Sequence, residues 1–262
     1  MKKYLLILSN FFVALGAVFA ADNSQRRGVL CLTFDDYGGE NWIKADALFK
    51  KYDAHATFLF FKQITGEKAR VMKKLQAAGH SVGLHTLDHR NADPLPPQWD
   101  METYIENQVM PQLEACRKYG IKVRCFAYPN NRRSKKSDEV LFKYFDYLRA
   151  GWGRSKKPVL MPRSEIGPKM LLRGGGIGDY YKSDIRQLKK WLAQAHKRDA
   201  LIVFVSHNIY PDAKHVHMPT QLLEELLKYA REELNMNIIG AEELLTVKSP
   251  SSGGQRRTSV SL

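Results

Sequence analysis

The chain of 262 residues contains only three cysteines, Cys31, Cys116 and Cys125, and no two of them have the spacing of a zinc knuckle. A structural zinc module built on cysteine is therefore excluded. Cys31 and Cys125 lie within short apolar runs, which predicts buried free thiols. A bridge between Cys116 and Cys125 stays open as the alternative.

The sequence also lacks a basic block. Lysine and arginine outnumber aspartate and glutamate by 41 to 27, but they are scattered and no cluster is interleaved with stacking aromatic residues. We therefore expect no nucleic-acid partner. The formal net charge of +14 is better suited to an anionic surface or polymer as neighbour.

After residue 20 there is no apolar run near the roughly 20 residues that a membrane-spanning helix needs. Residues 1–20 have the pattern of a secretory signal peptide, with Lys2 and Lys3 first, an apolar stretch over 5–19, and Val18-Phe19-Ala20 as the cleavage signal. We expect an exported soluble protein, periplasmic or extracellular, without a transmembrane segment.

From residue 21 to 248, short apolar runs alternate with longer amphipathic segments, which predicts one α/β domain of parallel strands joined by helices. Residues 152–178 are rich in glycine, proline and basic residues and are predicted to form a long loop. Residues 249–262 are polar and are predicted to be a disordered tail. Strands are expected at 29–34, 56–61, 81–84, 123–127, 146–150, 201–206 and 236–239, and helices at 42–52, 67–78, 100–119, 137–145, 184–198 and 220–233. Seven such strands favour a distorted (β/α) barrel.

Polar residues follow four of the predicted strands: Asp35-Asp36, His85 with His89, Tyr128-Pro129-Asn130, and His207. Taken singly, an aspartate pair commonly caps a helix, and two histidines four apart are commonly surface residues. Taken together they would converge, because functional groups of a barrel gather at the carboxyl ends of its strands. One carboxylate with two imidazoles makes three ligands for a divalent metal and leaves coordination positions open, and the second carboxylate is then available as a base.

Residues 28–245 resemble the polysaccharide deacetylases of the NodB-homology type, carbohydrate esterase family 4. Thr33-Phe34-Asp35-Asp36 is similar to the first signature of that family, residues 79–89 (GHSVGLHTLDH) to the second, and residues 201–207 to the last. The resemblance implies a metal-dependent hydrolase that removes N-acetyl groups from an amino-sugar polysaccharide or glycan.

The same resemblance implies a role for each matching residue. Asp36, His85 and His89 would hold the metal, with zinc favoured and cobalt, manganese or nickel as alternatives. Asp35 would take a proton from a metal-bound water, and His207 would protonate the leaving amine. Thr86 is expected to pack or cap, and Asp88 either to orient an imidazole or to be solvated.

The third signature of the family departs from its usual form. The family commonly has Arg-Pro-Pro-Tyr-Gly where this chain has Ala-Tyr-Pro-Asn-Asn at residues 127–131, although some branches also carry Ala-Tyr-Pro. Tyr128 and Asn130 are assigned to substrate or oxyanion contact, with the backbone N–H of Asn130 as donor. The arginine that would orient Asp35 is missing, and Arg173 is the first candidate to replace it, ahead of Arg124 and Arg132.

The fourth signature has no clean match. Arg173 or Asp179 could orient His207 or Asp35 from this region. The three glycines at 174–176 are consistent either with close approach of a ligand or with a flexible turn. Trp152, Tyr180 and Tyr181 are candidates for stacking on sugar rings, with core packing as the alternative.

Three other functions compete with N-deacetylation. The first is a glycan-binding pseudoenzyme, favoured by the altered third and fourth signatures and opposed by the retained Asp35. The second is hydrolysis of O-acetyl esters or deacylation of a lipid-linked sugar with the same catalytic residues. The third is a metal-dependent amidase for small amides.

Overall fold

The computed structural model describes residues 26–153, 157–210 and 217–247. The predicted signal peptide at 1–20 and the predicted tail at 249–262 lie outside these residues, so both stay predictions. Among the described helices there is none with the length and apolar character of a membrane span.

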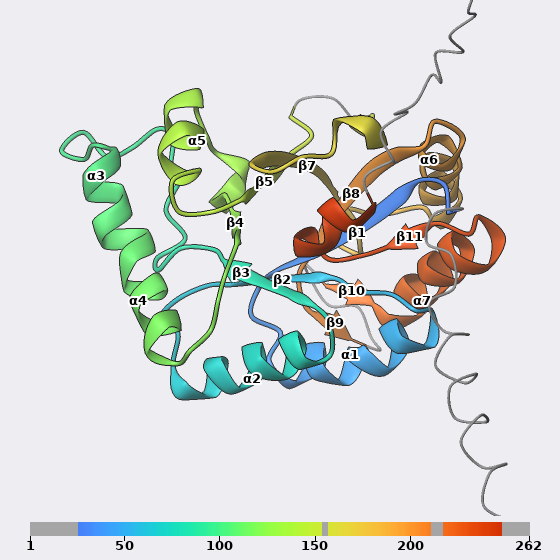
Figure 1. Ribbon diagram of the computed structural model, residues 1–262, viewed down its shortest axis with the longest axis horizontal. Helices are drawn as coiled ribbons and strands as arrows, with labels where there is room; N and C mark the ends of the chain where they lie inside the picture. Colours follow the sequence, from blue (N-terminus) through green and yellow to red (C-terminus); the bar gives the residue numbers. More distant parts are fainter. Residues whose placement is uncertain (1–25, 154–156, 211–216, 248–262) are drawn as a thin grey trace, which may run out of the picture.

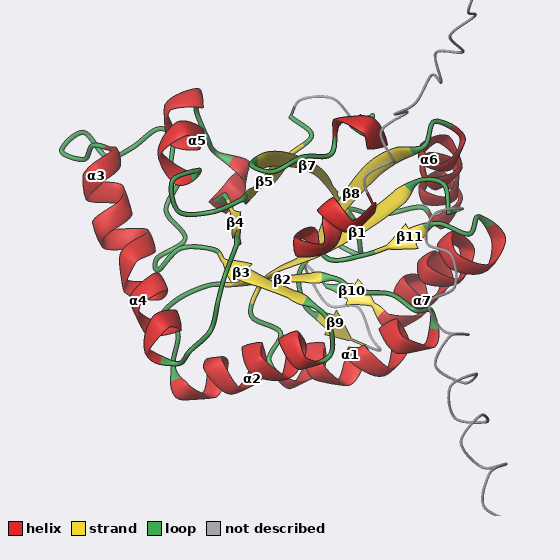
Figure 2. Cartoon of the chain, in the orientation of Figure 1, coloured by secondary structure: helices red, strands yellow, loops and turns green. Residues whose placement is uncertain are grey.

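Seven parallel strands close into a barrel, which confirms the predicted fold class (Figures 1 and 2). Their order around the ring is β1, β2, β3, β4, β5, β7 and β8, and β8 pairs back onto β1. The strands of the ring are β1 (Val29–Asp36), β2 (Thr57–Phe60), β3 (Ser81–Leu84), β4 (Cys125–Ala127), β5 (Tyr147–Gly151), β7 (Met170–Gly176) and β8 (Ala200–Ser206). Because all seven run the same way, their carboxyl ends meet at one mouth.

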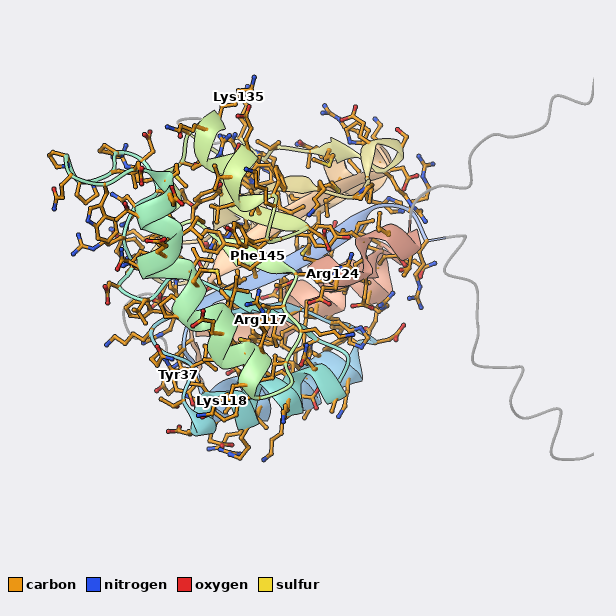
Figure 3. The ribbon with its side chains drawn as sticks, turned by 60° about the vertical axis from the view of Figure 1, so that its left-hand side comes forward. Tyr37, Arg117, Lys118, Arg124, Lys135 and Phe145 are labelled. Atoms are coloured by element: carbon orange, nitrogen blue, oxygen red, sulfur yellow. The ribbon has the colours of Figure 1, made fainter. Side chains whose placement is uncertain are left out.

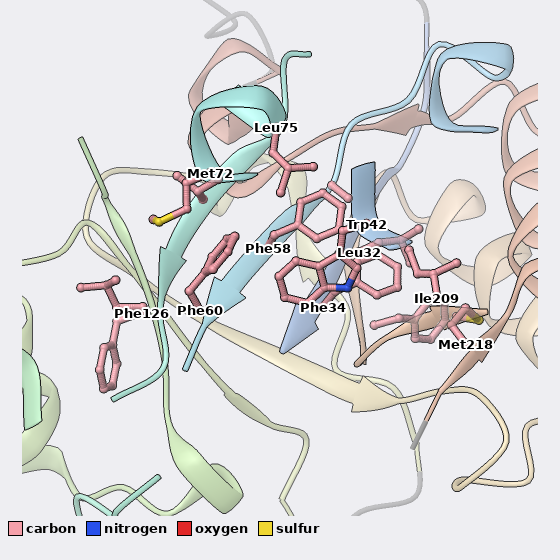
Figure 4. Close-up of a cluster of buried hydrophobic side chains, with 14 of the residues drawn as sticks. Leu32, Phe34, Trp42, Phe58, Phe60, Met72, Leu75, Phe126, Ile209 and Met218 are labelled. Atoms are coloured by element: carbon pink, nitrogen blue, oxygen red, sulfur yellow. The ribbon is translucent and has the colours of Figure 1, made fainter. Parts of the chain in front are cut away.

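Side chains alternate between the inside of the barrel and its outer face. Val29, Cys31 and Val203 belong to an apolar cluster that fills the inside. Phe34, Phe58 and other outward residues pack against the surrounding helices. Figure 4 shows this outer cluster, where Trp42 of helix α1 (Glu40–Lys51) lies with its ring centroid 5.0 Å from that of Phe58. The strands are thus buried on both faces, which explains their continuous apolar runs.

Helices surround the barrel on its outer side (Figure 1). They are α1 (Glu40–Lys51), α2 (Gly66–Ala77), α3 (Met101–Tyr104), α4 (Met110–Lys118), α5 (Lys135–Leu141), α6 (Ile185–Lys197) and α7 (Thr220–Lys228). A π-helical turn, Ile105–Val109, joins α3 to α4 without a break, and a second one, Tyr229–Glu233, extends α7. Side-chain caps mark several starts, such as Thr65 at α2 and Ser134 at α5. All six predicted helices are present.

The barrel differs from the sequence prediction in one strand. Residues 152–178 are not a long loop, because they contain β7 and the short strand β6 (Met161–Pro162), which pairs antiparallel with β8. The strand predicted at 236–239 is β11 (Asn237–Ile238), which lies beside β1 outside the ring. Strand β7 was not predicted because it contains glycines 174–176, and glycine is usually unfavourable in strands. A second, two-stranded sheet is formed by β9 (Ile209–Tyr210) and β10 (Met218–Pro219).

All three cysteines are free and buried, which confirms the prediction for Cys31 and Cys125 and rules out the alternative bridge between Cys116 and Cys125. Exposed basic side chains occur on separate elements: Figure 3 shows Lys135 at the top, at the start of α5, and Arg117 and Lys118 lower down, at the end of α4. This spacing follows from the scattered basic positions of the sequence.

Candidate active site

Two neighbouring carboxylates end β1 at the mouth of the barrel. Asp35 lies four residues after Cys31 on the same strand, so its side chain also points into the barrel. It is only 4% exposed. Asp36 turns away from the strand with φ at 72°, in the left-handed region that aspartate tolerates better than most residues. The two side chains therefore have different surroundings, one dry and one half-exposed.

The predicted metal ligands lie together beside Asp36. Its Oδ1 is 3.7 Å from Nε2 of His85 and 4.0 Å from Nε2 of His89. Ligand atoms of all three residues are within 4.8 Å of one another. Two ligands that each bond a metal at about 2.1 Å are at most about 4.2 Å apart, so small side-chain movements would complete the site.

The orientation of His85 also fits a metal ligand. Its Nδ1 is 2.9 Å from the carbonyl oxygen of Ala127. A carbonyl can only accept, so Nδ1 carries the hydrogen and Nε2 presents its lone pair toward Asp36. Ala127, at the altered third signature, thus orients an imidazole of the candidate metal site through its backbone carbonyl. The donor set and this tautomer fit zinc or a similar transition ion.

The loop that carries the two histidines is held by Gln108. Gln108 lies in the π-helical turn, and its carbonyl accepts the N–H of Leu87 at 3.0 Å. The side-chain amide of Gln108 accepts the N–H of Asp88 at 3.0 Å and donates to its carboxylate at 3.1 Å. Asp88 therefore anchors the loop rather than being a free surface residue.

Left-handed backbone is concentrated in this region. Thr86 and His89 have φ of 70° and 56°, and Asn130 and Asn131 across the mouth have 51° and 58°. For the β-branched Thr86 this conformation is costly, and such residues persist where the surroundings enforce them. The carbonyl of Thr86 accepts the N–H of Lys62, which ties this strained residue to the end of β2.

The partner of Asp35 is Arg149. The guanidinium of Arg149, inside β5, donates to Oδ2 of Asp35, and a second nitrogen donates to Oδ1 of Asn131 at 2.9 Å. Both ends of the ion pair are buried. Sequence reasoning missed Arg149, although its inward orientation follows from that of Tyr147, two residues earlier on the predicted strand.

The prediction that Arg173 orients Asp35 is wrong. Arg173 lies on β7 with the outward orientation of Leu171, and its Nε donates to the carbonyl of Gly151. Arg124 instead pairs with Asp146. Arg132 is exposed. The inward strand position at Arg149 supplies the cation that the third signature lacks.

These contacts set the protonation of the two innermost groups. Burial raises the pKa of Asp35, but the charge of the adjacent Arg149 guanidinium and the hydrogen bond that it donates act against burial, and the pKa lies below its usual value. Burial lowers the pKa of His85, and the charge of Arg149 acts the same way, against the opposing effect of Asp35. Asp35 is therefore ionised and His85 neutral near pH 7, as a base and a metal ligand require.

His207 follows β8 on the other side of Asp36. Its Nε2 is 3.9 Å from Oδ2 of Asp36, and its carbonyl accepts the indole N–H of Trp42 at 3.1 Å. Within the described residues its buried Nδ1 has no hydrogen-bond partner. Asn208 caps its own turn through the N–H of Ile209, and Asp179 is exposed. His207 thus faces the same space as the metal ligands.

Tyr128 does not have the predicted contact role. Its hydroxyl donates to Asp138 at 2.8 Å, its ring packs on Phe126, and its N–H donates to the carbonyl of Arg149. Both groups that could reach a substrate are thus used within the fold. Asn130 is exposed at the mouth, with its side-chain amide donating to Asn91, and its oxyanion role stays a prediction.

Comparison with known proteins agrees with this geometry. Residues 22–144 match the family described as polysaccharide deacetylase. A peptidoglycan-N-acetylglucosamine deacetylase of Bacillus cereus is 36% identical over 70 residues, which are 27% of this chain and 26% of that protein. The similarity thus spans about a quarter of the curated relative.

Solved structures share the fold at low identity. A family 4 acetyl xylan esterase from Clostridium thermocellum, in complex with a cobalt ion, has a TM-score of 0.58 at 16% identity, covering 84% of this chain and 91% of that one. A CE4-family pseudoenzyme from Bacillus anthracis has a TM-score of 0.56 at 18% identity, covering 85% of this chain and 66% of that one. Identities this low compare the fold alone.

Proposed function

We propose, from the premise that this chain belongs to the polysaccharide deacetylase family, that it is a metal-dependent hydrolase which removes N-acetyl groups from an amino-sugar glycan. The family implies an acetylated glycan as substrate. The N-acetyl bond, the metal and the residue roles below are the finer parts of the proposal.

One observation carries it: the buried ion pair between Asp35 and Arg149, next to the three-donor set of Asp36, His85 and His89. A protein that only bound glycans would need no second carboxylate here. Two buried charges are costly to desolvate, and such a pair is of use where an aimed, ionised base is needed. This pair is the argument against the pseudoenzyme.

The reaction adds water to the acetyl carbonyl and then breaks the bond from the carbonyl carbon to nitrogen. Asp35 accepts a proton from the attacking water, with Arg149 fixing the carboxylate through one of its oxygens. His207, on the opposite side of Asp36, donates a proton to the departing nitrogen, and acetate and the free amine are released. A divalent ion held by Asp36, His85 and His89 would supply Lewis-acid polarisation of the acetyl oxygen and activation of water.

The proposed place of action is outside the cytoplasm, in a periplasm or beyond the cell. Support comes from the signal-peptide pattern of residues 1–20. The excess of positive charge is suited to an anionic polymer there.

The test is acetate release from matched N-acetylated and O-acetylated oligosaccharides by the zinc-loaded protein. We expect release from the N-acetylated substrate and its loss in Asp35→Asn and in His207→Ala. Release from O-acetyl esters alone would replace the proposal by an esterase. Binding of the oligosaccharides without any acetate release would favour the pseudoenzyme.

A further inference from the structure

A pocket of about 670 Å³ opens beside the catalytic residues, between the loop after β4 and the ends of β5 and β7. Its walls are Trp152, Tyr181, Trp191, Asn131 and Arg132, and the strand-end glycines lie between them. We call it the Trp152 pocket. It adjoins the reaction centre directly, because Asn131 accepts a hydrogen bond from Arg149, which donates to Asp35.

The glycines of β7 create this pocket by letting aromatic rings lie against the backbone. A Cβ on Gly175 would be 2.5 Å from the ring of Trp152, and one on Gly176 would be 2.3 Å from the ring of Tyr181. Neither ring could keep its place beside a larger residue. The three glycines are therefore not a flexible turn, because two of them make room for the rings that line the pocket.

The rings are fixed to different degrees. Trp152 donates its indole N–H to the carbonyl of Arg173 and meets Trp191 edge-on, with centroids 5.2 Å apart. Tyr181 is 42% exposed and lies close enough to Asp35 and Arg149 to interact with their charges. An exposed aromatic face next to a rigid one, with amide groups opposite, is the chemistry that binds the apolar faces and hydroxyls of a pyranose.

Arg132 adds an available positive charge. Arg149 is neutralised by Asp35, and Arg133, the next residue along, is paired with Asp138. Arg132 is exposed and forms no ion pair with the described part of the chain. Its guanidinium can therefore donate two parallel hydrogen bonds to a carboxylate of a ligand.

We propose that the Trp152 pocket binds the sugar residue next to the one that loses its acetyl group, and that Arg132 selects a sugar carrying a carboxylate. This inference rests on the proposed function, because it defines the substrate of the same site. The aromatic walls hold the ring of the neighbouring sugar, and Arg132 holds its acidic substituent.

The experiment measures binding by calorimetry in a zinc-loaded His207→Ala background, so that turnover does not enter and Arg149 stays paired with Asp35. The two ligands are a neutral tetrasaccharide of N-acetylglucosamine and the same chain with a carboxylate-bearing ether on every second sugar. We expect the acidic ligand to bind roughly tenfold more tightly, as charge-assisted hydrogen bonds allow. Arg132→Gln should remove this preference, and Tyr181→Ala should weaken both ligands several-fold.

Two control variants match these changes outside the pocket. Lys135→Gln removes a charge from the exposed start of α5, and Tyr144→Ala removes a ring just after the same helix that is 39% exposed, close to the value for Tyr181. Both should leave the two dissociation constants within twofold of the background. Thermal unfolding checks that each variant is folded.

Equal affinity for the two ligands, or a preference that survives Arg132→Gln, would overturn the selection of an acidic sugar. Unchanged binding in Tyr181→Ala would overturn the pocket itself. Acetate release by the unmodified protein is measured separately. A preference lost with Arg132 but no acetate release would uphold the pocket while the proposed hydrolase fails.

Discussion

Arg149 and Asp35, 114 positions apart in the sequence, form a buried ion pair at the mouth of the barrel. Arg149 reaches Asp35 from β5, the strand that pairs with β4, and the altered third signature follows β4. Arg149 also donates to Asn131 in the loop after β4. One side chain of β5 thus connects the ends of β1 and β4 beside Asp35. The loss of the signature arginine is thus compensated from a neighbouring strand.

We predict that Arg149→Met lowers kcat/KM by on the order of 10²-fold or more, because Asp35 loses the partner that aims and ionises it. The pKa of Asp35 should rise, since burial then acts on it with less opposition, and the acidic limb of the pH profile should move to higher pH. Stability should also fall, by roughly 3–5 kcal/mol, because a buried charge is left unpaired. Steady-state kinetics across pH and chemical denaturation measure the two effects.

Arg173→Gln is the matched control. Arg173 is an arginine of the adjacent strand whose Nε contacts only the carbonyl of Gly151 among the bonds described for it. Its loss should leave the pH profile of kcat/KM in place. A shift as large as that of Arg149→Met would contradict the assignment of Arg149.

Asp35→Asn should reduce turnover by on the order of 10²-fold or more while leaving the bound metal unchanged, because the base and the ligand are separate carboxylates. Asp36→Asn should instead lower the metal content. Kinetics and elemental analysis of the two purified variants distinguish the roles. Activity of Asp35→Asn within a few-fold of the parent would remove Asp35 from the mechanism.

Gln108→Ala should weaken zinc binding by roughly tenfold, because the loop from His85 to His89 loses both side-chain bonds to Asp88. Competition with a chromophoric chelator measures the affinity without turnover. Gln112→Ala is the control: Gln112 lies one turn along the same helix and binds the carbonyls of Phe60 and Lys62 instead. If both variants bind zinc alike, Gln108 has only a general structural role.

We predict that the free energy of unfolding depends on pH through Glu242, which lies outside the candidate active site. Burial raises its pKa from 4.5 to about 7, with Arg124 opposing and Asp146 adding to the effect, and its buried Oε1 has no partner among the described residues. Between pH 4.5 and about 7, Glu242 is therefore protonated in the folded protein and ionised in the unfolded chain. Its contribution to stability consequently falls as pH rises through this range.

Glu242→Gln should accordingly stabilise the protein above neutral pH, by about 1 kcal/mol after allowance for partial solvent exposure, or roughly 2–4 °C in Tm. The gain should shrink toward acidic pH. Scanning calorimetry at about pH 8 and about pH 5 measures it. Glu233→Gln, at an exposed glutamate, is the control and should change neither value. An equal gain at both pH values would contradict the assignment.

The sequence alone predicted the barrel and the residues that gather at its mouth, because strands covered on both faces are continuous apolar runs with polar residues directly after them. His85 after β3 and His207 after β8 are examples. These signals are local, so they survive without knowledge of the three-dimensional arrangement.

What escaped prediction depends on contacts between distant residues. Arg149 is one basic residue within a short strand, and only its inward orientation shows that it meets Asp35. Strand β7 was not predicted because its glycines are unfavourable in strands. They are explained by contact with the rings of Trp152 and Tyr181, which the local sequence does not show. The hydrogen bonds between Gln108 and Asp88 likewise come from a residue of a π-helical turn, which apolar periodicity does not reveal.

The most direct test of the account is a zinc titration of the metal-stripped protein, with bound metal and acetate release from an N-acetylated oligosaccharide measured on the same samples. The account predicts that acetate release rises with bound zinc, levels off at one ion per chain, and is lost together with zinc binding in His89→Ala. Full acetate release without metal, or none at full zinc occupancy, would contradict it.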